Sequence, residues 1–188
     1  MKNIILLLLI FFYGSTIIAQ GVFSNQTNNT LEKVVQDYPS QFKNIKGEVL
    51  SSKPGSVEYK STITVPGAVS TTITQTSFSH RQTVSWQSVL YSGGKFDAAK
   101  NRFEELFTQI KNTIIKTEGQ KPVIIDGQYN TPAEEKGSTS ILFDLLPATG
   151  AMQKINIGLL LKNNNGEWKI VLSVSDKDGK ETDALTAK

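Results

Sequence analysis

The segment SFSHRQTVSWQSVL, residues 77–90, contains a side chain that could act as a catalytic base. It holds His80, the only histidine of the chain, together with Arg81 and Trp86. A hydrolytic triad needs a nucleophile, a base and a group that orients the base, so His80 is the only imidazole for the second role. No serine lies in a G-x-S-x-G motif, and the chain has no cysteine. The segment therefore offers a candidate base without a recognisable nucleophile.

Metal and phosphate sites find little support in the sequence. Zinc sites usually combine several histidine or cysteine ligands, and this chain has His80 alone. The segment DKDGKE, residues 176–181, is similar to the start of a calcium loop but lacks the later ligands and the distal glutamate. Gly93-Gly94 lacks the spacing of a P-loop. We therefore predict no catalytic residue, no metal site and no cofactor.

Paired carboxylates suit glycoside hydrolysis, and the chain has two such pairs. Glu104-Glu105 falls on the polar side of a predicted helix, and Glu134-Glu135 falls in the polar segment NTPAEEKGS. Both pairs are interpreted as solvated charge.

The first residues, MKNIILLLLIFFYGSTIIAQ, have the pattern of a secretory signal peptide. Lys2 precedes an unbroken apolar run from Ile4 to Tyr13, and the segment ends at the small residue Ala19. The run is shorter than the about 20 residues that a membrane span needs. We therefore predict that residues 1–19 are cleaved and that the protein is exported, periplasmic or secreted, with no membrane span after cleavage. The alternative is an uncleaved anchor.

Composition limits the class of partner. Cleavage after Ala19 would leave 169 residues and lower the formal net charge from +3 to +2, because Lys2 is the only charged residue removed. This charge is too small and too dispersed to indicate nucleic-acid binding. Without cysteine, an exported chain must rely on its apolar core. We expect residues 20–29 to be a flexible leader and residues 177–188 a polar tail.

Two segments have the apolar spacing of amphipathic helices. In NTLEKVVQDY, residues 29–38, apolar side chains recur at helical spacing, and Asn29 and Glu32 stand as in a capping box. In KFDAAKNRFEELFTQIKNTIIK, residues 95–116, one stripe holds Phe96, Ala99, Phe103, Leu106, Phe107, Ile110 and Ile114. Each predicted helix precedes four strand-like segments.

The chain after the leader resembles two copies of one α-β-β-β-β unit. Strands are predicted in GEVLSS, SVEYKSTITV, STTITQTSF and TVSWQSVLY, and then in PVIIDGQY, STSILFDLL, QKINIGLLLK and EWKIVLSVS. Trp86 and Trp168 stand at matching positions, 82 residues apart. We therefore predict an α+β fold of two tandem α-β4 units, residues 30–92 and 93–176, with helices packed on one face of an antiparallel sheet. The alternative is that two unrelated meanders look alike.

The predicted repeat also places the opening segment. Asn165-Gly166 is a strong hairpin signal in the second unit, and the equivalent connection of the first unit falls at HRQT, residues 80–83. A single strand from Val69 to Tyr91 would exceed the usual roughly 3–10 residues. We therefore predict that His80 and Arg81 are solvated loop residues and that Trp86 is a core residue.

The sheet face away from the helices is the predicted partner-binding surface. Strand alternation assigns to it Gln87, Val89, Tyr91, Lys169 and Val171. Neighbouring strands are expected to add Thr62, Thr64, Leu142, Asp144, Leu146, Asn156 and Leu160. Exposed apolar side chains among polar ones can mark a contact surface, and Tyr91 is the predicted anchor. The alternative is a face that is simply solvated.

Two tandem α-β4 units resemble the beta-lactamase inhibitory protein fold at the level of architecture, without a shared motif. That resemblance implies an exported protein-binding scaffold, and no residue role is transferred from it. We expect a noncatalytic exported binding or accessory protein with a possible protein partner in the envelope or outside the cell. The alternatives are an unrecognised hydrolase that uses His80 or a carboxylate, and a structural component of an envelope assembly.

Overall fold

The computed structural model describes residues 19–78, 81–117, 119 and 121–177. This part of the chain forms two α-helices, three short 3₁₀ helices and one antiparallel sheet of nine strands, which confirms the predicted α+β class. In chain order the elements are α2 (Ala19–Asp37), η1 (Tyr38–Ser40), β1 (Lys46–Lys53), β2 (Ser56–Ser61), β3 (Ser70–Phe78), β4 (Arg81–Gly93), α3 (Phe96–Ile110), β5 (Ile114–Ile115), β6 (Val123–Gly127), η2 (Glu134–Lys136), β7 (Ser138–Leu146), η3 (Gly150–Lys154), β8 (Ile155–Asn164) and β9 (Glu167–Asp176).

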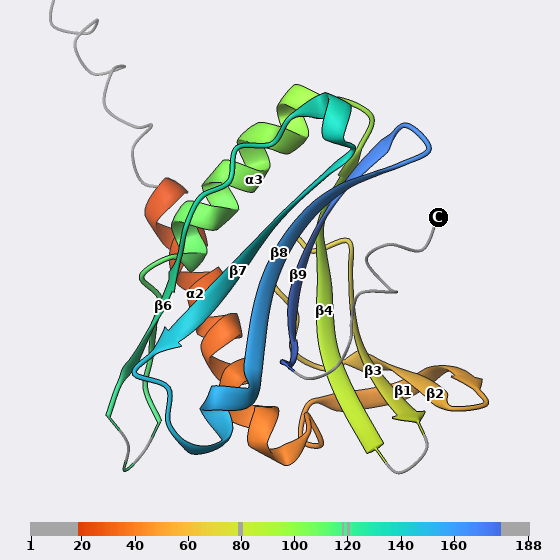
Figure 1. Cartoon of the computed structure of the whole chain (residues 1–188), viewed down its shortest axis with the longest axis vertical. Helices are drawn as coiled ribbons and strands as arrows, with labels where there is room; N and C mark the ends of the chain where they lie inside the picture. The colour runs from red at the N-terminus through yellow and green to blue at the C-terminus, as the bar shows by residue number, and fades with distance from the viewer. Residues whose placement is uncertain (1–18, 79–80, 118, 120, 178–188) are drawn as a thin grey trace, which may run out of the picture.

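The strands follow the spatial order β1-β2-β3-β4-β9-β8-β7-β6-β5, so β4 and β9 form the centre of the sheet. Their pairing runs from Ser85 opposite Ser175 to Gly93 opposite Trp168. Both helices lie on the same side of the sheet (Figure 1). Neither helix of the described chain is long and apolar enough to cross a membrane.

The core lies between the sheet and the helices. Helix α3 contributes most of its predicted stripe, and the ring of Phe96 lies 4.8 Å from that of Trp168, measured between centroids. Trp86 is fully buried and Trp168 is 2% exposed, so the prediction that both are core residues is confirmed. Strand alternation supplies the rest, since every second side chain of β4, β7 and β9 is buried: Val84, Leu90, Ile141, Phe143, Leu145, Ile170, Leu172 and Val174.

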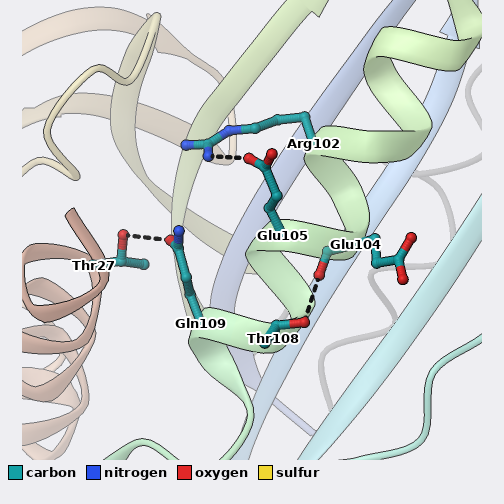
Figure 2. Close-up of polar contacts among 6 residues, drawn as sticks. All are labelled: Thr27, Arg102, Glu104, Glu105, Thr108 and Gln109. Atoms are coloured by element: carbon teal, nitrogen blue, oxygen red, sulfur yellow. Dashed lines mark hydrogen bonds and ion pairs between the residues drawn. The ribbon is translucent and has the colours of Figure 1, made fainter. Parts of the chain in front are cut away.

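Helix α2 begins at Ala19 rather than near Asn29, so residues 20–29 are helical where the sequence predicted a flexible leader. Thr27 Oγ1 donates to Gln109 Oε1 of α3 at 3.2 Å, which Figure 2 shows. Thr113 Oγ1 donates to Asn28 Oδ1 at 3.0 Å. Polar tertiary contacts therefore hold the helix at Thr27 and Asn28, and an apolar periodicity does not reveal such contacts.

Helix α3 ends at Ile110, whereas the apolar stripe predicted a helix through residue 116. Asn112 has a left-handed φ of 67°, a conformation that asparagine adopts more readily than most residues. The chain then reverses, and Ile114 pairs with Ile124 in β6. β-branched residues favour strands. Ile114 is consequently 51% exposed instead of lying on a buried helix face.

Side chains of α2 occupy the open edge of β5. Glu32 Oε1 accepts a hydrogen bond from the backbone N of Lys116 at 2.9 Å, and Gln36 Nε2 donates to the backbone O of Lys116. Glu32 and Gln36 lie one helical turn apart, so together they supply the acceptor and donor that a neighbouring strand would supply. Because an unpaired edge promotes pairing between chains, α2 protects this side of the sheet.

Of the two hairpins at the centre of the sheet, one has the predicted connection and the other does not. Between β8 and β9, Asn165 and Gly166 have φ values of 53° and 87°, as the predicted Asn-Gly turn requires. Between β3 and β4, Arg81 pairs with Phe78 inside the ladder, so it is a strand residue and not part of a predicted HRQT loop. His80 lies outside the described residues. So do residues 1–18 of the predicted signal peptide and residues 178–188 of the predicted tail.

Candidate binding surface

Strands β4 and β9 bring four of the five predicted binding residues to one face. Val89 pairs directly with Val171 at the middle of the two strands. Gln87 and Lys169 each lie two positions from this pair on their own strands, so alternation places them on the same side. The flanking side chains are buried on the opposite, helix-covered side: Trp86, Ser88, Ile170 and Leu172. Gln87, Val89, Lys169 and Val171 therefore lie on the outer face of the sheet.

Tyr91 does not lie on this outer face. The register of β4 with β9 shifts between Val89 and Tyr91, so Leu90 is an extra residue and Tyr91 stands opposite Ile170. Ile170 is fully buried, and Tyr91 packs against the same core. A β-bulge changes the side to which the following side chains point. The predicted outer-face position of Tyr91 is wrong because strict alternation ignores this bulge.

Hydroxyl and amide side chains surround the Val89–Val171 pair. Ser173 and Ser175 are 8% and 4% exposed, and Ser173 Oγ lies 3.5 Å from the carbonyl oxygen of Gly158. Two rows cross the strands here, Thr74–Ser85–Ser175 and Thr72–Gln87–Ser173. The centre of the outer face thus presents short polar groups and little protruding apolar surface.

The most exposed apolar side chains of the outer face lie toward β6 and β7. Leu142 is 65% and Leu146 is 51% exposed. Exposed and buried side chains alternate along β7, so both leucines lie on its exposed side. Ile124 is 44% exposed and stands opposite Leu146, and Ile114 stands opposite Ile124. Strand alternation predicts Leu142 and Leu146 on this face. It does not predict Ile124, which lies in the uninterrupted apolar run VII, or Ile114, which fits the pattern of a helix.

The remaining residues expected on the outer face have mixed positions. Asn156 and Leu160 share the face on β8, and Leu160 is only 7% exposed. Thr62 and Thr64 lie beyond the end of β2 at Ser61, where Thr62 Oγ1 donates to the carbonyl oxygen of Ile45 at 3.1 Å. These two threonines therefore do not extend the sheet face.

The carboxylate pairs do not converge on a shared site. Arg102 Nη1 donates to Glu105 Oε2 at 2.9 Å, and Figure 2 shows the carboxylate of Glu104 pointing in another direction. Glu134 and Glu135 are exposed in η2. Hydrolysis of a glycosidic bond needs two carboxyl groups on either side of one bond, an arrangement that neither pair has.

Three groups of the described chain have perturbed pKa values, and they lie on β9, on β1 and in the loop after β6. The hydrogen bond from Ser92, followed by that from Lys169, lowers the pKa of Glu167. Burial, followed by the charge of Glu104, raises the pKa of Tyr129. Burial also lowers the pKa of Lys46 on β1. Among the described residues, no group of three or more His, Cys, Asp or Glu side chains could hold a metal ion.

Comparison with known proteins assigns no family. No protein-family model matches the chain, and no curated protein matches it.

Proposed function

We propose that the protein is an exported, noncatalytic binding or accessory protein that contacts a protein partner through the outer face of its sheet. The secretory pattern of residues 1–19 supports export. The observation that carries the binding proposal is the exposure of Leu142 and Leu146 on one face of β7. A solvated antiparallel face normally carries polar residues at such positions, and exposed apolar side chains among polar ones can mark contact surfaces.

We also propose that the two halves of the chain are related repeats. In support, α2 precedes four strands and α3 precedes five, and Trp86 and Trp168 lie on the last strand of each half. Val89 and Val171 pair directly and are 82 residues apart, as are the two tryptophans. Residues equivalent under the repeat thus meet at the centre of the sheet, as an approximate two-fold axis between β4 and β9 would require.

The binding proposal is tested by capture of a partner from the native envelope fraction. We expect the double variant Leu142→Asp/Leu146→Asp to lose capture, because two carboxylates would replace the apolar contact. The matched control is Val49→Asp/Leu50→Asp, since Val49 and Leu50 are 57% and 50% exposed on β1 at the far edge of the sheet. Equal capture by both variants would contradict the proposal. Loss of a hydrolytic activity of the protein in a His80→Ala variant would favour the hydrolase alternative.

A further inference from the structure

We propose that the outer face binds a protein segment that presents a basic side chain between two aliphatic ones. This inference rests on the proposed function, because it takes the outer face to be a protein-binding surface. The surface concerned lies on β5, β6 and β7 and is called the acidic-apolar patch. It consists of Ile114, Ile124, Leu142 and Leu146 together with Asp126 and Asp144.

Three of the four apolar residues of the patch form a continuous row across three strands. Ile114, Ile124 and Leu146 are successive cross-strand partners, and neighbouring strands lie about 4.8 Å apart. Leu142 stands four residues from Leu146 on the same face of β7, about 13 Å along the strand. The patch is therefore wide enough for contact with several side chains of a partner.

A row of two carboxylates divides the apolar residues. Asp126 and Asp144 stand directly opposite each other, and Asp144 lies between Leu142 and Leu146 on β7. Their side chains are 52% and 75% exposed. Like charges at directly opposed positions destabilise strand pairing. The row therefore lowers the stability of this side of the sheet, and a cation placed between the two carboxylates would offset that effect.

The chain itself neutralises this row only weakly. Lys111 Nζ lies 3.8 Å from Asp126 Oδ1, and Lys177 Nζ lies 3.8 Å from Asp144 Oδ1. Exposed ion pairs of this length contribute little to stability. A guanidinium group from a partner forms shorter, charge-assisted hydrogen bonds with carboxylates, and its planar fork can contact more than one oxygen.

Charge also decides between a foreign segment and a second copy of this chain. A two-fold contact through the patch would place the Asp126–Asp144 row against the same row of the other copy. Four carboxylates would then meet in an apolar contact, which like-charge repulsion opposes. A partner with an aliphatic-x-basic-x-aliphatic sequence in extended form matches instead the spacing of Leu142, Asp144 and Leu146.

The test titrates the ¹⁵N-labelled chain from Gln20 onward with a blocked peptide, Ser-Leu-Ser-Arg-Ser-Leu-Ser, and with the same peptide carrying Glu at its centre. We expect the Arg peptide to bind at least about tenfold more tightly and to shift the amide signals of residues 124–126 and 142–146. Asp126→Lys/Asp144→Lys should reverse this preference. The control Glu134→Lys/Glu135→Lys makes the same change in net charge on exposed residues of η2 and should leave the preference intact.

Equal affinity for the two peptides, or no shifts in β6 and β7, would overturn the inference. It would also be overturned by a wild-type dimer that Leu142→Asp dissociates, because the occupant would then be a second copy. A chain that ends at Lys177 provides a further control. If it bound the Arg peptide at least about tenfold more tightly than the chain that ends at Lys188, residues 178–188 would be the occupant of the patch instead of a partner. If Asp126→Lys/Asp144→Lys retains the native partner while Leu142→Asp/Leu146→Asp loses it, only the basic segment is refuted. Retention by both would refute the proposed function as well.

Discussion

At the scale of single residues, Trp86 is among the largest fully buried side chains, and its indole Nε1 donates to Ser61 Oγ at 3.1 Å. We expect Trp86→Ala to lower the free energy of unfolding by about 3–5 kcal/mol, because it leaves a large cavity. Urea denaturation measures the change. Leu50→Ala, at a half-exposed position on β1, should stay within about 0.5 kcal/mol. The reverse order of the two effects would contradict the burial of Trp86.

Glu167 offers a second test at this scale. The Ser92 hydroxyl donates to its carboxylate and Lys169 Nζ lies 3.1 Å from Oε2, and both contacts lower its pKa. A lowered pKa stabilises the fold above the unfolded-state pKa, and this contribution is lost as the pH falls through the folded-state pKa. We expect Ser92→Ala to raise the pKa of Glu167 toward its ordinary value in a carboxyl NMR titration. Val89→Ala should not change it, and an unchanged pKa in Ser92→Ala would show that the hydrogen bond does not form in solution.

At the scale of the element, the β-bulge at Leu90 decides what Tyr91 does. Since Tyr91 is partly buried opposite Ile170, we expect Tyr91→Ala to lower the free energy of unfolding by about 1–3 kcal/mol. Thr72→Ala on the outer face of β3 should cost less than about 1 kcal/mol in the same denaturation experiment. If Tyr91→Ala instead left stability unchanged and weakened partner capture, the side chain would lie on the outer face after all.

Helix α2 gives the second prediction for an element. The double variant Glu32→Ala/Gln36→Ala removes both partners of the Lys116 backbone and leaves the β5 edge open. We expect it to self-associate in sedimentation velocity at concentrations where the wild type does not, because open edges pair with one another. Lys33→Ala is the control, as Lys33 is exposed on the same helix. A double variant that behaves like this control would mean that the cap does not limit edge pairing.

Periodicity predicted the elements better than their ends or their irregularities. Alternation of apolar and polar residues predicted most of the strands, and an apolar stripe with a 3.6-residue period predicted α3. Both patterns arise because one side of the element is buried. It missed α2 before Asn29, where Thr27 contacts Gln109 through polar atoms. It also misplaced Tyr91, because nothing in SWQSVLY marks Leu90 as an extra residue. Ile114 was predicted to be helical because it continues the apolar stripe of α3. The pair Ile114-Ile115 fits a short strand equally well, so the sequence does not distinguish the two.

At the scale of the whole molecule, the two halves share one sheet and one core. β4 and β9 pair over Ser85–Gly93, and the buried residues of both halves form one cluster. We therefore expect a single cooperative unfolding transition, with coincident midpoints by circular dichroism and tryptophan fluorescence. Trp86→Phe and Trp168→Phe variants leave one fluorescent reporter in each half, and each reporter should give the same transition as circular dichroism of its own variant. A difference between the two probes in either variant would show that the halves unfold separately.

The central position of β9 has a consequence for how the protein is made. β9 lies between β4 and β8 and follows every other strand of the described chain, so the strand that completes the middle of the sheet is synthesised after the strands on both sides of it. Until it emerges, β4 and β8 each present an unpaired edge, and the contacts that join the halves span much of the sequence. Such late, long-range pairing is slow and prone to aggregation. If the chain is exported unfolded, in line with the proposed function, folding only after β9 has crossed the membrane would keep those temporary edges from meeting those of other nascent chains.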